Sequence, residues 1–234
     1  MTITSTQNQR LKEVRKLRRR RGRQRAGRFV AEGEDLLAAA DSAGWEALER
    51  YCAAGSGLGG TEVEPALLAA ASGLGSGTRA LAVYAERWAT APAGPLCVYL
   101  HGIHDPGNVG TILRSAQAFG ASSVALGPGS ADPFGPRSVR ASMGAVFGVA
   151  LARVAGIAEL PGRRVALVAG LGRPLCEVSL ENVSLLIGAE RAGLPDGVVA
   201  AADEIASIPI QTHSVNAAMA ATIALYEATR MARL

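Results

Sequence analysis

Three polar stretches of this chain each follow a short apolar segment, and each carries side chains that could bind or orient a reacting group. The first, His104–Arg114, contains Asn108 and Arg114. Asp105 or Asn108 could simply cap a helix, but capping does not explain an arginine in an otherwise apolar helix. Because helical side chains lean toward the N-terminus, Arg114 can reach back toward Asn108. An amide and a guanidinium that converge at a strand end predict a polar site.

The second stretch, Leu186–Pro195, places a carboxylate beyond an apolar segment. Gly188 permits close approach of the backbone, and Glu190 lies in the loop that follows. Taken alone, this pattern is typical of an ordinary strand-to-helix turn.

The third stretch, Ile208–Asn216, ends in a hydroxyl and an amide. Ser214 and Asn216 could either cap the helix that follows or face a substrate. That helix, expected over Asn216–Arg230, is rich in alanine almost all round, which is typical of a buried or intersubunit helix.

These stretches must be positioned by the elements between them. After Pro95, short apolar segments alternate with helical ones, and we expect strands over 96–101, 124–126, 149–154, 165–169, 185–187 and 205–210. Continuous apolar strands between helices predict an α/β fold with a parallel sheet covered on both faces. The carboxyl ends of such strands are the usual place for ligands.

The first 28 residues form a basic segment. They hold eleven Lys and Arg against Glu13 alone, a net charge of +10, which leaves −6 for the rest of a chain whose total is +4. Such a cluster is typical of a phosphate-binding surface, although a solvated charged helix has the same composition. Arginine predominates, which suits forked hydrogen bonds to phosphate. The candidate RNA-binding residues are Arg10, Lys12, Arg15, Lys16, Arg18, Arg19, Arg20, Arg21, Arg23, Arg25 and Arg28.

The first part of the chain predicts a second set of elements. Residues 5–28 can form one basic helix with apolar residues at spacings of three. A helix is expected over Pro65–Ala71 and a strand over Arg79–Ala85. Two prolines and small residues make Ala89–Pro95 the best candidate for a linker. Aromatic residues make up 4% of the chain, so we expect cores built from Ala, Val, Leu and Ile.

Composition argues against several other classes of protein. No uncharged apolar run reaches the roughly 18 residues of a membrane helix, and the basic N-terminus has no apolar core of a secretion signal. Cys52, Cys97 and Cys176 are odd in number and far apart, which indicates a reducing cytoplasm and neither disulfides nor a metal site. Gly55–Gly60 matches a dinucleotide-binding pattern, but the preceding residues make a poor strand and the ribose-binding acid is missing.

Together and in this order, the three stretches resemble the SpoU (TrmH) family of RNA ribose 2′-O-methyltransferases, over about residues 96–230. The matching residues are Asn108 and Arg114 in the first motif, Gly188, Glu190, Gly193 and Leu194 in the second, and Ser214, Val215 and Asn216 in the third, followed by Leu225, Tyr226 and Glu227. The third motif departs from the family pattern in a shorter loop and in Val215 in place of leucine.

The N-terminal part resembles the L30e-like RNA-binding domain found in many members of this family. We therefore expect residues 1–88 to form an L30e-like substrate-binding domain, 89–95 a linker, and 96–234 the methyltransferase domain of the SPOUT superfamily. The resemblance implies a deep trefoil knot in this second domain, and a homodimer whose active site lies at the subunit interface.

The resemblance also implies a cofactor, S-adenosyl-L-methionine (AdoMet). Main-chain groups of Gly188, Ile208 and Val215 would contact it, and Ala169 and Gly170 would line the adenine pocket. The implied reaction is attack of a ribose 2′-hydroxyl on the sulfonium methyl group.

The resemblance implies a catalytic set in which Arg114 acts as the base. Because arginine is a poor base, two roles stay open for Arg114: deprotonation, or clamping of a phosphate. Asn108, Ser214 and Asn216 would orient substrate and loops, and Glu190 would hold a loop or meet the substrate.

We expect the substrate to be ribosomal RNA of the 23S type, because of the extra RNA-binding domain. The alternatives are a transfer RNA methyltransferase, or a non-catalytic RNA-binding protein on the same scaffold. A dead enzyme should have lost Asn108, Arg114 or Asn216, and none of the three is missing.

Overall fold

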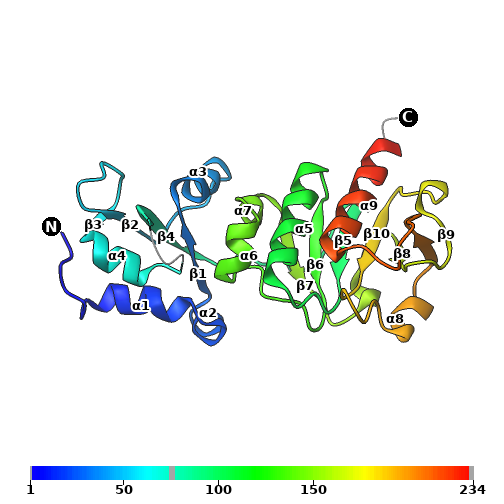
Figure 1. Cartoon of the computed structure of the whole chain (residues 1–234), viewed down its shortest axis with the longest axis horizontal. Coiled ribbons are helices and arrows are strands. Elements are labelled where there is room, and N and C mark those ends of the chain that lie inside the picture. Colours follow the sequence, from blue (N-terminus) through cyan, green and yellow to red (C-terminus); the bar gives the residue numbers. More distant parts are fainter. Residues whose placement is uncertain (1, 74–76, 232–234) are drawn as a thin grey trace. The chain divides into compact units, whose positions relative to one another are not determined.

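The computed structural model describes residues 2–73 and 77–231, and the chain divides into two compact units (Figure 1). Unit 1 consists of Met1–Glu86 and Asp132–Phe147, and unit 2 of Arg87–Ala131 and Gly148–Leu234. The chain leaves unit 1 just before the linker expected at 89–95. The segment Asp132–Phe147, which the expected boundaries assign to the methyltransferase domain, returns to unit 1.

Unit 1 is a four-stranded sheet with helices. Its elements are α1 (Gln9–Leu17), α2 (Arg20–Ala26), β1 (Arg28–Glu32), α3 (Glu34–Ser42), β2 (Glu49–Ala53), β3 (Thr61–Val63), α4 (Pro65–Ala71), β4 (Ala80–Ala85), α6 (Pro136–Ala141) and α7 (Ala145–Gly148). The strand order is β1-β4-β2-β3, with β4 antiparallel to both neighbours and β2 parallel to β3. The glycine-rich loop joins β2 to β3, so no helix follows it as a dinucleotide-binding motif requires.

The basic segment is two helices, and the prediction of one helix over 5–28 is wrong. The Asn8 side chain caps α1, whose predicted apolar residues are buried, and Arg19 takes an extended conformation that begins α2. The Arg23 guanidinium donates to the carbonyl oxygens of Leu17 and Arg18, at 2.9 and 3.0 Å. It thereby provides hydrogen bonds to carbonyl groups at the C-terminal end of α1, which have no partner within the helix. Gly22 permits this sharp return, because a Cβ there would lie 2.1 Å from the Lys16 oxygen.

The two faces of the first sheet have different cores. One face packs aliphatic side chains of α1, α4 and the strands, including Leu11, Val30 and Leu81. The other face holds an aromatic cluster whose members are Phe29, Trp45, Tyr84, Phe134 and Phe147. The expectation of purely aliphatic cores therefore fails here, since half of the ten aromatic residues gather at one place. Phe134 and Phe147 come from the returning segment, which explains why that segment belongs to unit 1.

Unit 2 contains the predicted parallel sheet. Its elements are β5 (Leu96–Leu100), α5 (Pro106–Ala118), β6 (Ser123–Leu126), β7 (Ala150–Arg153), β8 (Arg163–Leu167), β9 (Arg173–Pro174), β10 (Val183–Ile187), α8 (Asp196–Ala200), β11 (Glu204–Ser207) and α9 (Ala217–Met231), with short 3-10 turns at Ile157–Glu159 and Leu175–Glu177. The seven strands run in the order β7-β6-β5-β10-β8-β11-β9, and every pairing is parallel.

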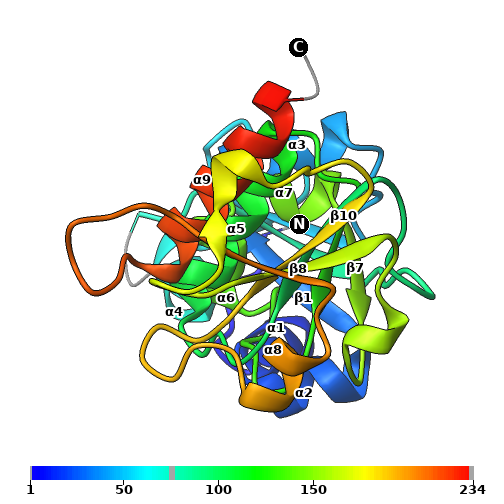
Figure 2. The same ribbon diagram turned by 90° about the vertical axis from the view of Figure 1, so that its right-hand side faces the viewer.

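Helices cover both faces of this sheet, as predicted. α5 and α9 lie side by side over one face (Figure 2), and Ser115 and Thr222 share a 2.6 Å hydrogen bond between them. The other face packs Tyr99, Ala166 and Leu186 against apolar side chains of α8 and its surroundings. Because all strands are parallel, the ends of β5, β8, β10 and β11 share one edge of the sheet. No helix among the described residues is long and apolar enough to cross a membrane.

Candidate active site at the carboxyl ends of the parallel strands

A pocket opens where β8, β10 and β11 end. It encloses about 640 Å³, including space open to solvent. Its walls are mostly small or aliphatic side chains, and among the described residues that line it Glu190 is the one charged side chain. The lining residues are Leu167, Val168, Ala169, Ile187, Gly188, Ala189, Glu190, Gly193, Ile208, Ile210, Ser214, Val215, Ala217 and Ala220.

The second motif forms a tight loop over this pocket. Ala189 and Gly193 exchange two backbone hydrogen bonds of 3.1 and 2.8 Å, so the chain folds back within five residues. Gly188 has to be glycine, because a Cβ there would lie 2.3 Å from the Gly193 carbonyl carbon. Gly193 has a φ of +65°, which favours glycine, and Leu194 anchors the loop in the core below. The loop therefore holds Glu190 in a fixed place at its tip.

A chain of hydrogen bonds joins the three motifs. The Asn216 Nδ2 atom donates to Asn108 Oδ1 at 3.1 Å, and Asn108 Nδ2 donates to the Glu190 carboxylate. Asn108 lies in the first turn of α5, Glu190 in the loop after β10, and Asn216 directly before α9. We call this arrangement the Glu190–Asn108–Asn216 relay.

The start of α9 fixes the direction of this relay. The Asn216 Oδ1 atom accepts from the backbone N–H groups of Ala218 and Met219, at 2.8 and 3.3 Å, and so caps the helix. Its amide nitrogen must then point away from the helix and donate to Asn108. The Asn108 nitrogen in turn faces a carboxylate, which can only accept when it is ionised. Capping and orientation are therefore two tasks of one side chain.

In the first motif, the Arg114 side chain has no bonding partner among the described residues. Asp105 caps α5 by accepting from Gly107 N at 2.6 Å, so Asn108 is not the cap and its side chain is available for the relay. Arg114 lies two turns into α5, where its side chain is exposed and has no hydrogen-bond or ion-pair partner within residues 2–73 and 77–231. An exposed, unpaired guanidinium can bind an anion.

An uncharged pair supports the start of the first motif. The Tyr99 hydroxyl and His101 Nδ1 are 2.7 Å apart, and His101 N donates to Ile187 O at 2.9 Å, which ties β5 to β10. Burial lowers the pKa of His101 and raises the pKa of Tyr99, because it penalises the charged form of each. Both side chains are therefore neutral near pH 7.

The pocket brings together most of the residues expected to contact a cofactor. Ala169, Gly188, Ile208 and Val215 line it, whereas Gly170 lies in the turn beyond, with a φ of +68°. Of the expected catalytic residues, Glu190 and Ser214 also line it, and Asn108 and Asn216 reach it through the relay. The sequence analysis did not single out the remaining apolar lining, namely Leu167, Val168, Ile187, Ala189, Ile210, Ala217 and Ala220. For Leu167, Val168 and Ile187 the position at strand ends was the available signal, whereas Ala217 and Ala220 lie on α9.

One face of α9 exposes large apolar side chains. Met219, Ile223 and Tyr226 are 63%, 40% and 54% exposed, and their spacing of four and three residues puts them on one side of the helix. The opposite side packs within the unit, where Ala224 is fully buried. Met219 and Ile223 are thus exposed at the surface of α9, whereas the Tyr226 ring is partly covered by an edge-to-face contact with Phe119.

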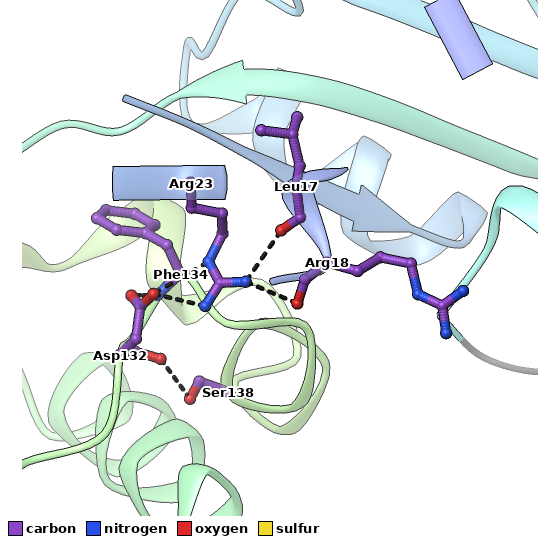
Figure 3. A network of polar contacts seen from close by, with 6 residues as sticks. All are labelled: Leu17, Arg18, Arg23, Asp132, Phe134 and Ser138. Carbon is purple, nitrogen blue, oxygen red and sulfur yellow. Dashed lines mark hydrogen bonds and ion pairs between the residues drawn. The ribbon is translucent and has the colours of Figure 1, made fainter. Parts of the chain in front are cut away.

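In unit 1 the basic segment forms a hollow at the turn between α1 and α2. It is lined by Arg15, Lys16, Arg19, Arg21, Gly22 and Arg25. Arg23 has to be removed from the set of expected RNA-binding residues, because its side chain is buried and bonded to Asp132 (Figure 3). The segment is also no detachable arm, since α1 buries Leu11, Val14 and Leu17 in the core.

The relay gives a first prediction, on Asn216. Asn216→Asp keeps an oxygen to cap α9 but loses the donor to Asn108, whose amide then faces two carboxylates. We expect any catalytic activity at this site to fall more than tenfold with the melting temperature nearly unchanged. Asn216→Ala should lose the activity and also about 1 kcal/mol of stability, since the cap is gone. Thermal unfolding and turnover of both variants, measured together, check this; wild-type turnover by Asn216→Asp would show that the relay has no functional role.

Comparison with known protein families matches both parts of the chain. Residues 95–226 match the model of the SpoU rRNA Methylase family, and residues 8–75 match that of the MRM3-like substrate binding domain. The chain belongs to the SpoU rRNA methylase family.

Two solved structures resemble nearly the whole chain. An rRNA methyltransferase from Sinorhizobium meliloti with bound AdoMet has a TM-score of 0.86 at 29% identity, covering 99% of this chain and 98% of that one. The SpoU methyltransferase AviRb from Streptomyces viridochromogenes, also in complex with AdoMet, has a TM-score of 0.86 at 28% identity, covering 97% and 99%. The predicted α/β class with a smaller N-terminal unit is thereby confirmed.

Curated relatives align mainly with the second part of the chain. A 23S rRNA (uridine(2479)-2′-O)-methyltransferase from Streptomyces viridochromogenes is 37% identical over 140 residues, which is 53% of this chain and 49% of the relative. The 23S rRNA (guanosine(2553)-2′-O)-methyltransferase RlmP from Bacillus subtilis is 32% identical over 136 residues, 54% and 55% of the two chains. In these relatives the match spans about half of the relative's own length.

Proposed function

We propose that this protein is an AdoMet-dependent RNA 2′-O-ribose methyltransferase that acts on ribosomal RNA of the 23S type. The observation that carries this proposal is the Glu190–Asn108–Asn216 relay at the mouth of an apolar pocket, with Arg114 on the adjoining helix. A protein that only bound RNA would have no need for three motifs joined by directed hydrogen bonds beside a small-molecule pocket. The named activities of the relatives support the same reaction.

The walls of the pocket have a chemistry that suits AdoMet. Ala169, Gly188 and Ile208 lie where strands end, so that main-chain groups and small or aliphatic side chains face the space. Glu190 contributes a carboxylate at the edge, which suits a cofactor that carries positive charge. No group of three or more metal-ligating side chains occurs within the part of the chain that the structure describes, and the proposal requires no metal.

When bound, AdoMet supplies a methyl group activated on a sulfonium, so that transfer to a ribose 2′-oxygen releases S-adenosylhomocysteine and one proton. The task of the protein is then mainly to position the hydroxyl and to remove its proton. Asn108, held at both ends by the relay, is rigid enough to orient the ribose. Arg114 either takes the proton or binds the neighbouring phosphate, and Ser214 lines the pocket.

Unit 1 would hold the RNA. The hollow between α1 and α2 gathers Arg15, Arg19, Arg21 and Arg25 around a glycine, and none of these four forms an ion pair with an acid among the residues described. Uncompensated arginines of this kind bind phosphate by forked hydrogen bonds. The match to a substrate binding domain over residues 8–75 supports this assignment.

We also propose a homodimer. The strip of Met219, Ile223 and Tyr226 on α9 supports it, because apolar side chains aligned on one helix face usually mark an interface. The resemblance to the family implies an active site beside that interface. The trefoil knot stays a prediction of the same resemblance.

A direct assay tests the proposed reaction. The protein is incubated with ribosomal RNA and AdoMet carrying a labelled methyl group, and the RNA is then hydrolysed with alkali. We expect the label in alkali-resistant dinucleotides, because a 2′-O-methyl group blocks cleavage at the adjacent phosphate. Ala169→Trp, which fills the pocket, is the control that should abolish AdoMet binding. Label in alkali-labile mononucleotides would mean that a base is methylated and would overturn the ribose assignment.

A further inference from the structure

Helix α6 carries two cations outside the basic segment. Arg140 lies three positions after Arg137, so the two residues lie on one face of the helix. Both side chains are exposed. Ser138 and Val139, on the opposite face, are buried. Neither arginine has a hydrogen-bond or ion-pair partner among residues 2–73 and 77–231. α6 therefore presents two uncompensated positive charges to solvent.

A buried ion pair attaches the start of this helix to α2. Arg23, 4% exposed, donates to the Asp132 carboxylate through Nε at 3.0 Å and Nη2 at 2.6 Å (Figure 3). The other Asp132 oxygen accepts from Phe134 N at 2.9 Å, and its carbonyl oxygen accepts from the Ser138 hydroxyl at 2.8 Å. The same guanidinium closes the end of α1 through Leu17 and Arg18. One buried arginine thus fixes both the turn of the basic segment and the start of α6.

The start of α6 is also close to the exposed arginines of the basic segment. The Arg18 Nε atom and the Pro136 Cβ atom each lie 3.8 Å from the position that a Cβ on Gly73 would take, so they are near neighbours. Arg23 Nη2 lies 3.4 Å from the equivalent position on Gly135. Arg137 follows Pro136 directly. Its charge therefore adds to the field of a cluster that already carries many more bases than acids.

We propose that Arg137 and Arg140 are phosphate-binding residues that extend the RNA-binding surface of the basic segment onto α6, and that Arg23 and Asp132 are the positioning pair that holds α6 there. This inference rests on the proposed function and adds to it. The RNA surface is not confined to the N-terminal part of the chain, because a segment that lies in sequence between β6 and β7 contributes to it.

The salt dependence of RNA binding tests the two arginines. The probe is single-stranded poly(U), whose affinity is measured from about 50 to 300 mM salt. Each lost phosphate contact on a single strand should flatten the slope of log affinity against log salt by about 0.7, so Arg137→Ala/Arg140→Ala should flatten it by about 1.4. The matched control is Arg50→Ala/Arg79→Ala, which removes the same charge from unit 1 at arginines that already pair with Asp41 and Glu34. Its slope should stay close to that of the wild type.

A third variant separates failure of this inference from failure of the proposed function. Arg19→Ala/Arg21→Ala/Arg25→Ala removes three residues of the hollow and should flatten the slope by about 2. If this variant changes the slope and the α6 variant does not, α6 has no part in RNA binding and the inference is overturned. If neither variant changes it, the basic segment does not bind RNA, and the proposed role of unit 1 fails as well.

The positioning pair is tested by Asp132→Ala, which removes a negative charge. Net charge alone predicts tighter RNA binding, whereas loss of the pair's positioning role predicts weaker binding and a slope flattened as in the α6 variant. Circular dichroism at the assay temperature shows whether the variant is folded, and Asp132→Asn, which keeps a hydrogen-bond acceptor for Arg23, should restore part of the slope. Tighter binding by a folded Asp132→Ala would overturn the positioning role.

Discussion

Arg114→Ala should abolish methyl transfer to RNA and leave AdoMet binding close to that of the wild type. Arg114 does not line the pocket, and it has no partner within the described part of the chain whose loss would disturb the fold. Its loss should therefore act on the substrate, through the proton or through a phosphate. A group that acts on proton transfer contributes about 100-fold to 10,000-fold in rate. Single-turnover transfer of a labelled methyl group and calorimetric titration with AdoMet measure the two effects.

Arg114→Lys distinguishes the two roles of this residue. Lysine keeps a positive charge that binds phosphate, although it loses the planar fork. If Arg114 clamps a phosphate, the lysine variant should recover a large part of kcat and show its defect mainly in KM. If Arg114 acts in the transition state only, kcat and kcat/KM should fall together. Turnover of Arg114→Ala near that of the wild type would remove the residue from catalysis and leave the assignment to the family intact.

Ile223→Arg should convert the proposed dimer into a monomer and abolish methyl transfer with it. Ile223 lies in the middle of the exposed strip on α9, and a charge there would lose its hydration if the strip were covered by a second copy. The side chain is exposed in the single chain, so the variant should fold. Sedimentation at micromolar concentration gives the oligomeric state, and methyl transfer gives the activity.

Leu48→Arg is the matched control for this experiment. Leu48 is 48% exposed, similar to Ile223, but lies in unit 1 before β2. The control should sediment and react as the wild type does. Arginine at Ala220 or Ala224 would be a poorer test, because Ala220 lines the pocket and Ala224 is buried against its own unit. A wild-type protein that is a monomer at micromolar concentration would contradict the dimer.

The amino-acid sequence predicts the catalytic unit well, because its signals are local. The run Leu96–Leu100 is apolar throughout and Val183–Ile187 is apolar except for Ser184, a pattern typical of strands buried on both faces. In a parallel sheet their carboxyl ends share one edge, so the motifs that follow them had to meet. Gly188 and Gly193 also indicate a close approach or an unusual conformation of the backbone at their own positions. The tight loop that they form is therefore a local property of the sequence.

The relay could not be predicted from the sequence. By residue type, α5 could be capped by Asp105 or Asn108, and α9 by Ser214 or Asn216. Only the structure shows that Asp105 and Asn216 are the caps. The choice depends on which oxygen lies within hydrogen-bond reach of a backbone N–H, a matter of tenths of an ångström. Once that choice is made, the direction of every amide in the relay follows.

Unit 1 shows most clearly what the sequence determined and what it did not. Its strongly basic first 28 residues and the apolar spacing in α1 are composition and periodicity, which the sequence states directly. That Arg23 is buried while Arg21 and Arg25 line an open hollow was decided by the tertiary structure alone, because the three residues are identical in type. The reason is Asp132, which lies more than a hundred residues away in the sequence. Burial of a guanidinium is costly unless a carboxylate pairs with it, and no local sequence pattern predicts which arginine pairs with Asp132.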